Sequence, residues 1–302
     1  MKYVLKIDAL GKYPEINLSE DEYKSLKIAS EKLSNGLAIE EKYEILISNY
    51  LDFEVQLLEH AAQAMIRIPY DYDYFFQVRM SFNRRLVNLL TSARLYIDQL
   101  HHHIRPIIPD YPNLKDELKR LFSKEYDSSL HYRFMEALRN YVQHRGIPVH
   151  WFQFNNHSDD SGVERLLIFT MELASLKAYL LEDDSFKKKV LEEIPDKIDL
   201  KMATRAYIEG ISRIHSSARN FTENVLKESR AIIENAIISY KKIHSDNCIG
   251  LHAICFDDNK IIDRVMLLLE WDDIRLKLNR CNSELINLRR RYVSGQTKNY
   301  DK

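Results

Sequence analysis

The chain has 302 residues, of which 45% are hydrophobic and 29% charged, values typical of a soluble globular protein with a sizeable core. Its 44 Lys and Arg residues nearly balance its 45 Asp and Glu residues, which argues against a protein that holds nucleic acid through bulk positive charge. With only seven glycines and seven prolines, it has too few turn residues for a many-stranded β fold, so we expect a mainly α-helical chain.

Cysteine usage and hydropathy predict a cytoplasmic protein. Cys248, Cys255 and Cys281 are odd in number and form no CxxC pair, so we expect neither a disulfide framework nor a cysteine metal site. The first residues, MKYVLKIDALGKYPEINLSEDEY, turn polar and acidic too early for a signal peptide. No apolar run is long enough to span a bilayer, and we expect no membrane partner.

The N-terminal segment is expected to be irregular or to form a short strand. Ser19, with Glu22 three residues later, makes a capping-box pattern, which predicts that a helix begins there. Gly36 stands where this helix is expected to end, because glycine is the usual residue just beyond a helix C-terminus.

Prolines separate the next helical patterns. A second helix is expected to stop at Pro69 and a third at Pro106, because proline cannot continue a helix interior. The stretch RPIIPDYPN (105–113) is the clearest linker. The helical patterns in this part of the chain cover about residues 39–68, 72–104, 113–123 and 128–145.

After Pro148 the apolar residues change to a shorter period. VHWFQFN and VERLLIFTM flank the turn-forming NHSDDSG, which predicts a β-hairpin over about residues 148–171. A short strand or hairpin is also expected in CIGLHAICFDDNK (248–260). The remaining helical patterns cover about residues 172–182, 185–193, 199–243 and 261–292.

The stretch ALRNYVQHRGIPVHW contains the strongest candidate for chemistry. On a helix, Arg139, Asn140 and His144 share a polar face with Arg133, Glu136 and Gln143, and apolar side chains occupy the opposite face. An arginine, four to six intervening residues and then a histidine occur about twice by chance in such a composition, so that loose pattern carries no weight. Three matches occur, Arg139/His144, Arg145/His150 and Arg94/His101. Of these three arginines only Arg139 is followed directly by Asn, which lowers the chance expectation to roughly a tenth of a match.

The segment LRNYVQHRGIPV, after the long helix FNRRLVNLLTSARLYIDQL, resembles the HEPN superfamily of prokaryotic ribonucleases and toxins. The signature of that family is an Arg, a polar residue, three further residues and a His. The resemblance covers about residues 72–182 and is closest to phage-defence members that continue with GIPV and a hairpin. It implies a HEPN-like helical bundle with an inserted β-hairpin and additional N- and C-terminal helices. The expected regions are 1–70 (helical), 71–182 (HEPN-like core) and 183–302 (long helices).

The resemblance also implies an activity and an assembly. Active HEPN members dimerise so that two motif-bearing helices meet across a two-fold axis, and they cleave RNA without a metal or another cofactor. The implied catalytic residues are Arg139 and His144, with Asn140 assisting, and the flanking Gln143, Arg133 and Arg145 are candidates for contacting RNA. These residue types suit attack of a ribose 2′-OH on the adjacent phosphorus, because His moves protons near neutral pH and Arg stabilises the phosphate charge.

Two alternatives remain open. The chain could be an inactive HEPN scaffold that binds a protein or RNA partner, with the polar helix face buried in a dimer. It could also be a toxin neutralised by a nucleotidyltransferase antitoxin. For the active enzyme, the setting that the resemblance implies is a toxin or antiphage-defence effector. The HHH run at 101–103 is interpreted as a polar helix end and not as a metal site, because consecutive residues on a helix point in different directions.

Overall fold

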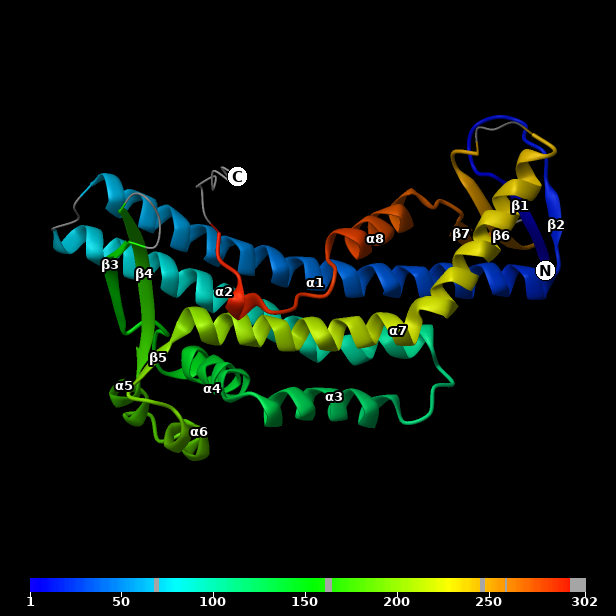
Figure 1. The fold of residues 1–302 in the computed structure, drawn as a ribbon. Coiled ribbons are helices and arrows are strands. Elements are labelled where there is room, and N and C mark those ends of the chain that lie inside the picture. Colours follow the sequence, from blue (N-terminus) through cyan, green and yellow to red (C-terminus); the bar gives the residue numbers. More distant parts are fainter. Residues whose placement is uncertain (68–70, 161–164, 245–247, 259, 294–302) are drawn as a thin grey trace. The chain divides into compact units, whose positions relative to one another are not determined.

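The structure is a computed structural model that describes residues 1–67, 71–160, 165–244, 248–258 and 260–293. These residues are mainly helical and include two small antiparallel sheets (Figure 1), which confirms the expected mainly α class. The helices are α1 (Glu20–Ile66), α2 (Tyr72–Ile107), α3 (Leu114–Ser128), α4 (Leu130–His144), α5 (Lys177–Leu181), α6 (Lys188–Glu193), α7 (Leu200–Lys241), α8 (Glu270–Cys281) and a 3-10 turn at Leu288–Arg290. The strands are β1 (Lys2–Ile7), β2 (Ile16–Leu18), β3 (Trp151–Asp159), β4 (Leu166–Leu176), β5 (Lys197–Asp199), β6 (Leu251–Asp257) and β7 (Lys260–Met266).

The chain forms two compact units, and each is assembled from stretches that are distant in sequence. Unit 1 contains residues 1–45, 95–118 and 215–283, and unit 2 contains 46–94, 119–214 and the described residues from 284 onward. The helices α1, α2, α3 and α7 each contribute residues to both units.

The capping box at the start of α1 is present as predicted. The Ser19 backbone N–H donates to Oε2 of Glu22 over 2.7 Å, and the Glu22 N–H donates to Oγ of Ser19 over 3.2 Å. These two bonds satisfy donors that the first helical turn leaves without a partner in the helix.

Gly36 does not end the first helix, so the predicted break between two helices is wrong. α1 continues through Gly36 for 47 residues in all. The reason is tertiary packing: a Cβ at position 36 would lie 2.9 Å from Cδ2 of Leu226 in α7, so the glycine makes room for that side chain. Within the described part of the chain, α1 and the other helices lack an apolar stretch long enough to cross a membrane.

The proline-marked boundaries are close to those predicted. α2 passes Pro106 and ends one residue later, which places the proline in the last helical turn. The break expected at Pro69 lies outside the described residues. α4 begins after Ser129, whose Oγ accepts the N–H of Tyr132 at 3.2 Å.

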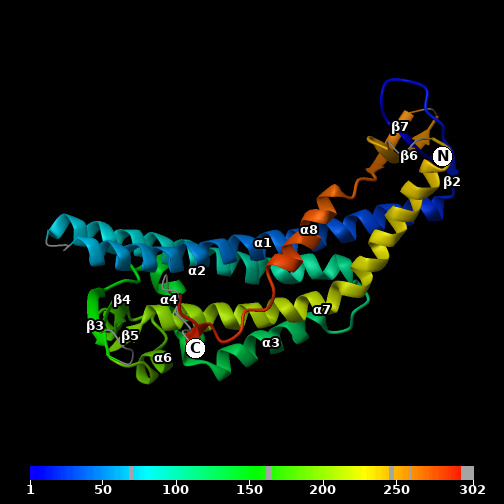
Figure 2. The same cartoon turned by 45° about the horizontal axis from the view of Figure 1, so that its top comes forward.

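Unit 2 contains the predicted hairpin, which is longer than expected. β3 and β4 pair antiparallel from Trp151 opposite Ala174, and β5 adds to β4 as a third strand. The helix expected over 172–182 is therefore wrong for its first half, because residues up to Leu176 remain in β4 and only α5 is helical. Figure 2 shows the strands of this sheet side by side; α5 contacts β4, and α6 contacts α4.

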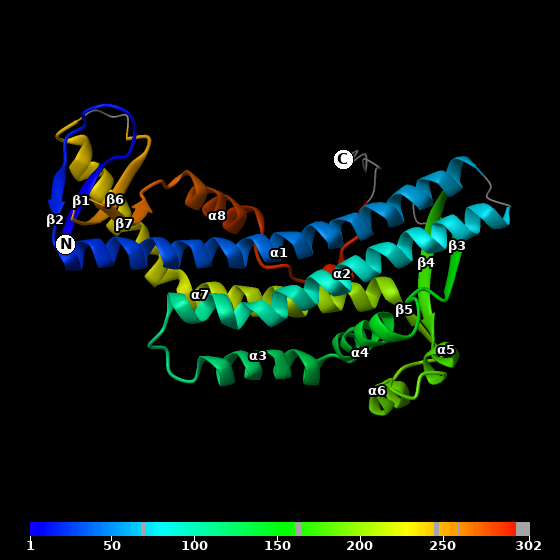
Figure 3. The ribbon, with the colours of Figure 1, turned by 180° about the vertical axis from the view of Figure 1, so that it is seen from behind.

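Unit 1 contains a four-stranded sheet in the order β2-β1-β6-β7, gathered where α1 begins and α7 ends (Figures 1 and 3). The strand or hairpin expected around residues 248–260 is confirmed as β6. The long helix expected over 261–292 is wrong, because β7 occupies residues up to Met266 and only α8 follows as an α-helix. Antiparallel pairing of β7 with β6 decided this conformation, and residue-by-residue helical spacing could not reveal it.

A charged cluster is buried between α1 and α7 in unit 1. Nε and Nη2 of Arg219 donate to the two carboxylate oxygens of Glu40 over 2.8 and 2.5 Å. The ring of His215 stacks on Tyr43 at 3.7 Å between centroids, with Nε2 lying 3.3 Å from Oε2 of Glu40 and Nδ1 lying 2.9 Å from the Tyr96 hydroxyl. Burial raises the pKa of Glu40, but the hydrogen bonds from Arg219 and His215 outweigh it and lower the pKa to about 2.

Candidate functional site on helix α4

Helix α4 is amphipathic, as its sequence predicts. Its buried side chains are Tyr132, Phe134, Met135, Ala137, Leu138 and Tyr141. On the other face, Asn140, Gln143 and His144 are exposed, whereas the side chain of Arg139 is mostly buried, with 13% of it exposed. The three motif residues therefore lie on the polar surface of one helix within unit 2.

Arg139 is oriented by neighbours that the motif does not contain. Its Nη1 donates to Oε1 of Gln143 over 3.3 Å, and its Nη2 lies 4.0 Å from Oε2 of Glu136. The other oxygen of Glu136 accepts a 2.5 Å hydrogen bond from the hydroxyl of Tyr207 in α7. Tyr207 is fully buried, so this contact joins the arginine side of α4 to a rigid part of the unit.

Arg139 and His144 lie at opposite edges of the polar face. They are five positions apart, which corresponds to about 140° around a helix of 3.6 residues per turn. Asn140 and His144, at a spacing of four, are neighbours on the same edge. Among the described residues, His144 makes no side-chain hydrogen bond or ion pair, so its imidazole is available to a ligand.

Arg133 connects three segments of unit 2. Its Nη1 donates to the backbone carbonyls of Tyr126 and Asp127 over 2.9 and 3.0 Å, and its Nη2 forms an ion pair with Glu193 of α6. These partners match its charge and fix its position. Arg133 was a candidate for contacting RNA, and the structure places it in an intramolecular contact.

Arg145 follows the end of α4 and is also paired. Its Nε lies 3.2 Å from Oδ1 of Asp183, a carboxylate that is almost fully buried while the arginine is 59% exposed. A hydrogen bond from the Ser185 hydroxyl, helped by Arg145, lowers the pKa of Asp183 and keeps it charged. Of the three candidates for RNA contact, only Gln143 therefore lies beside Arg139 on the exposed face.

The GIPV segment after α4 folds back and is anchored beneath the helix end. The Val149 N–H donates to Oδ1 of the buried Asn83 over 2.8 Å, and the Pro148 carbonyl accepts from the Ser175 hydroxyl over 2.5 Å. His150 accepts the Leu176 N–H at Nδ1 over 3.0 Å. Burial lowers the pKa of His150 to about 4, so this ring is a neutral structural acceptor near neutral pH.

The histidine run at 101–103 is divided between different surroundings. The rings of His101 and His102 are 5.9 Å apart and nearly perpendicular, whereas Nδ1 of His103 lies 3.1 Å from Oδ1 of Asn35. In the part of the chain that the structure describes, no group of three or more His, Cys, Asp and Glu side chains is arranged to hold a metal ion.

Sequence reasoning did not select Glu136 and Tyr207 as part of the site. Glu136 stands three residues before Arg139, a spacing that places the two on neighbouring turns of one helix face and could have identified it. No local signal could have identified Tyr207, because it is 71 residues away from Glu136 and meets it only after α7 packs against α4.

In comparisons with known proteins, no protein-family model, no curated protein and no solved structure matches the chain. A function for the chain therefore has to be argued from its own residues.

Proposed function

We propose that the chain is a metal-independent endoribonuclease of the HEPN type that acts as a homodimer in the cytoplasm. Arg139 and His144 would be catalytic, with Asn140 assisting. The proposal rests on one observation about the polar face of α4. Glu136 and Gln143 orient Arg139 at one edge of this face, and Asn140 and His144 at the other edge are open to a ligand.

The chemistry follows from the side chains. His144 would remove the proton from a ribose 2′-OH or donate one to the departing 5′-oxygen, since imidazole exchanges protons near neutral pH. Arg139 would stabilise the negative charge that grows on the phosphate as the 2′-oxygen attacks phosphorus. The products are a 2′,3′-cyclic phosphate and a 5′-hydroxyl, and DNA is excluded because it has no 2′-OH.

The positions of Arg139 and His144 on α4 favour a dimeric site. Because they lie about 140° apart around the helix, one helix does not direct both at a single phosphate. A two-fold axis beside α4 would supply two arginines and two histidines, enough for a base, an acid and phosphate contacts. We further propose that the enzyme is a toxin or antiphage-defence effector, whose activity a partner protein such as an antitoxin restrains.

One observation favours an inactive scaffold as the second candidate. Arg133 and Arg145 are both engaged in intramolecular ion pairs, so fewer cations surround the motif than an RNA groove would use. In that case the exposed face of α4 would bind a protein or RNA partner without cleaving it.

The test compares wild type with His144→Ala and with His157→Ala, a control that removes another exposed histidine in the same unit. Each protein is incubated with total RNA in excess EDTA, its oligomeric state is measured by light scattering, and the fragments are analysed for 2′,3′-cyclic ends. We expect cleavage by wild type and His157→Ala only, from dimers in all three cases.

The other outcomes separate the candidates. Cleavage by His144→Ala as well would show that α4 does not hold the catalytic site. No cleavage by any of three intact dimers, repeated after co-expression with the products of neighbouring genes, would favour the scaffold.

A further inference from the structure

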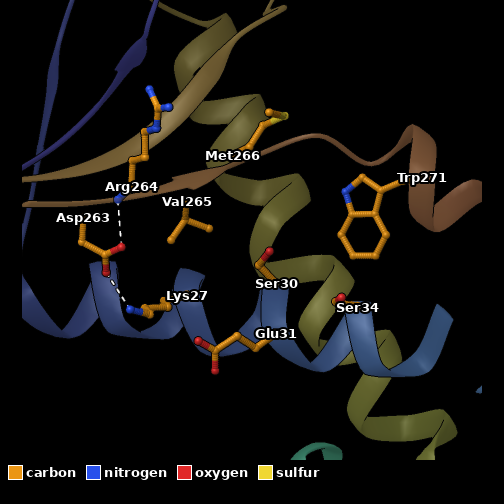
Figure 4. A pocket seen from close by; sticks show the side chains of 9 residues that line it. All are labelled: Lys27, Ser30, Glu31, Ser34, Asp263, Arg264, Val265, Met266 and Trp271. Carbon is orange, nitrogen blue, oxygen red and sulfur yellow. Dashed lines mark hydrogen bonds and ion pairs between the residues drawn. The ribbon is translucent and has the colours of Figure 1, made fainter. Parts of the chain in front are cut away.

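A groove in unit 1, separate from the α4 face, lies between helix α1 and strand β7 (Figure 4). It has a volume of about 360 Å³, within the usual range for ligand sites. One wall is a stripe of α1 with a single-face helical spacing. The other wall is the second half of β7, and Trp271 of α8 stands at one end. The lining residues are Lys27, Ser30, Glu31, Ser34, Asp263, Arg264, Val265, Met266 and Trp271.

β7 is an edge strand of its sheet. Among the described residues it pairs only with β6, and the other edge strand, β2, is just three residues long. The Leu267 N–H donates to the Leu251 carbonyl over 2.9 Å. This bond shows which residues of β7 direct their backbone groups toward β6, because hydrogen-bonded and non-hydrogen-bonded pairs alternate along an antiparallel pair of strands. Val265 is therefore hydrogen-bonded to β6, whereas Arg264 and Met266 turn their backbone N–H and C=O groups away from β6.

The first half of β7 is protected against pairing, and the second half is not. A β-bulge interrupts the register near Phe256, and charged Lys260 stands at the strand start. Asp263 accepts the outward Arg264 N–H at Oδ1 over 3.0 Å and binds Nζ of Lys27 at Oδ2 over 2.6 Å. Three backbone groups farther along β7 point away from β6 and have no such partner among the described residues. They are the Arg264 carbonyl and the N–H and carbonyl of Met266, and they lie beside the groove.

The second half of β7 contributes two apolar side chains to the groove, Val265 and Met266. Val265 is almost buried on the face toward α1, and Met266 is 53% exposed. Trp271 lies beyond Met266, at one end of the groove (Figure 4). Lys27 is paired with Asp263 and Arg264 with Asp8, so the Glu31 carboxylate on the α1 wall is the remaining charge among the lining residues. The groove therefore offers backbone hydrogen bonds and an apolar surface, with one negative charge on its helix side.

We propose that β7 and α1 form a peptide-binding groove, in which an extended segment of a partner protein adds to β7 as a further strand and places an apolar side chain against Val265 and Trp271. Alternating donors and acceptors at strand spacing are matched by another extended backbone. The helix stripe opposite β7 closes the groove on the other side of the added segment. This inference does not depend on the proposed ribonuclease activity.

The test begins with selection of peptides from a random heptapeptide display library on the full-length wild-type protein. Affinities of a selected peptide are then measured for wild type, Met266→Ala and Met266→Pro. The alanine variant keeps the outward N–H, whereas the proline variant removes it, and proline is tolerated on an edge strand because that N–H is not used by β6. We expect at least tenfold weaker binding to Met266→Pro than to Met266→Ala.

Two further measurements do not depend on the proline variant folding. Hydrogen exchange of the wild type should show that the peptide protects the Met266 amide. Peptides N-methylated at successive positions should lose binding at alternate residues only, as pairing along one edge requires.

Three results would overturn the proposal: selection of no peptide, binding that leaves the Met266 amide unprotected, or N-methylation effects without alternation. Self-association of wild type that Met266→Pro abolishes would also overturn it, because the groove would then hold a second copy of this chain.

Discussion

The hydroxyl of Tyr207 in α7 donates a 2.5 Å hydrogen bond to Oε1 of Glu136 in α4, and the other oxygen of Glu136 lies 4.0 Å from Nη2 of Arg139. The orientation of the motif arginine therefore depends on a tyrosine in another helix. Burial, together with the charge of Glu136, raises the pKa of Tyr207, so the phenol stays protonated and remains a donor.

Replacing Tyr207 with Phe should lower the free energy of unfolding by about 1–3 kcal/mol, because the Glu136 carboxylate loses a charge-assisted hydrogen bond inside the unit. Urea unfolding followed by circular dichroism measures this change. The control is Tyr72→Phe, since Tyr72 is 83% exposed and its loss of a hydroxyl should change stability by less than about 0.5 kcal/mol. Equal stability of Tyr207→Phe and Tyr72→Phe would contradict the importance of this bond.

The buried pair in unit 1 gives a second prediction. Glu40→Gln should lower the free energy of unfolding by about 3–5 kcal/mol, because Arg219 and its neighbours lose their buried counter-charge. Glu223→Gln is the matched control, since Glu223 pairs with Lys227 on the surface, where both side chains are more than half exposed. Its effect should stay below about 1 kcal/mol. A small effect of Glu40→Gln, similar to the control, would show that the buried pair contributes little.

His150 predicts how stability depends on pH. Its pKa is about 4 in the folded protein, below the ordinary value of 6.5 that applies to the unfolded chain. As the pH falls from 6.5 towards 4, the unfolded chain takes up a proton at this site and the folded protein does not. The stabilisation present above pH 6.5 is therefore lost progressively, by at most about 1.4 kcal/mol per pH unit.

The variant His150→Asn separates this contribution from those of other groups. Asparagine keeps an oxygen acceptor for the Leu176 N–H but does not titrate, so the loss of stability between pH 7 and pH 5 should be smaller than in wild type. The exposed His157, changed to Asn, serves as the control and should leave the wild-type slope unchanged. Urea unfolding at several pH values provides the comparison, and parallel curves for wild type and His150→Asn would refute the prediction.

The features that the sequence predicted correctly depend on residues close together in the chain. The capping box of Ser19 and Glu22, the hairpin after Pro148 and the amphipathic face of α4 each follow from local hydrogen bonding or from a short apolar period. Such interactions can be predicted without the tertiary structure, because the interacting groups are within a few residues of each other along the chain.

The features that only the tertiary structure decided depend on distant segments. Gly36 reads as a helix end but accommodates Leu226, and residues 261–266 read as helical but pair with β6 as a strand. Likewise, Arg133 reads as a candidate for contacting RNA until Glu193 takes its charge. By itself the sequence determined that the protein is mainly helical and where its polar motif lies. The packing of distant helices and strands decided which of those polar groups stay open to a ligand, because an ion pair or a strand ladder forms only when the fold brings both partners together.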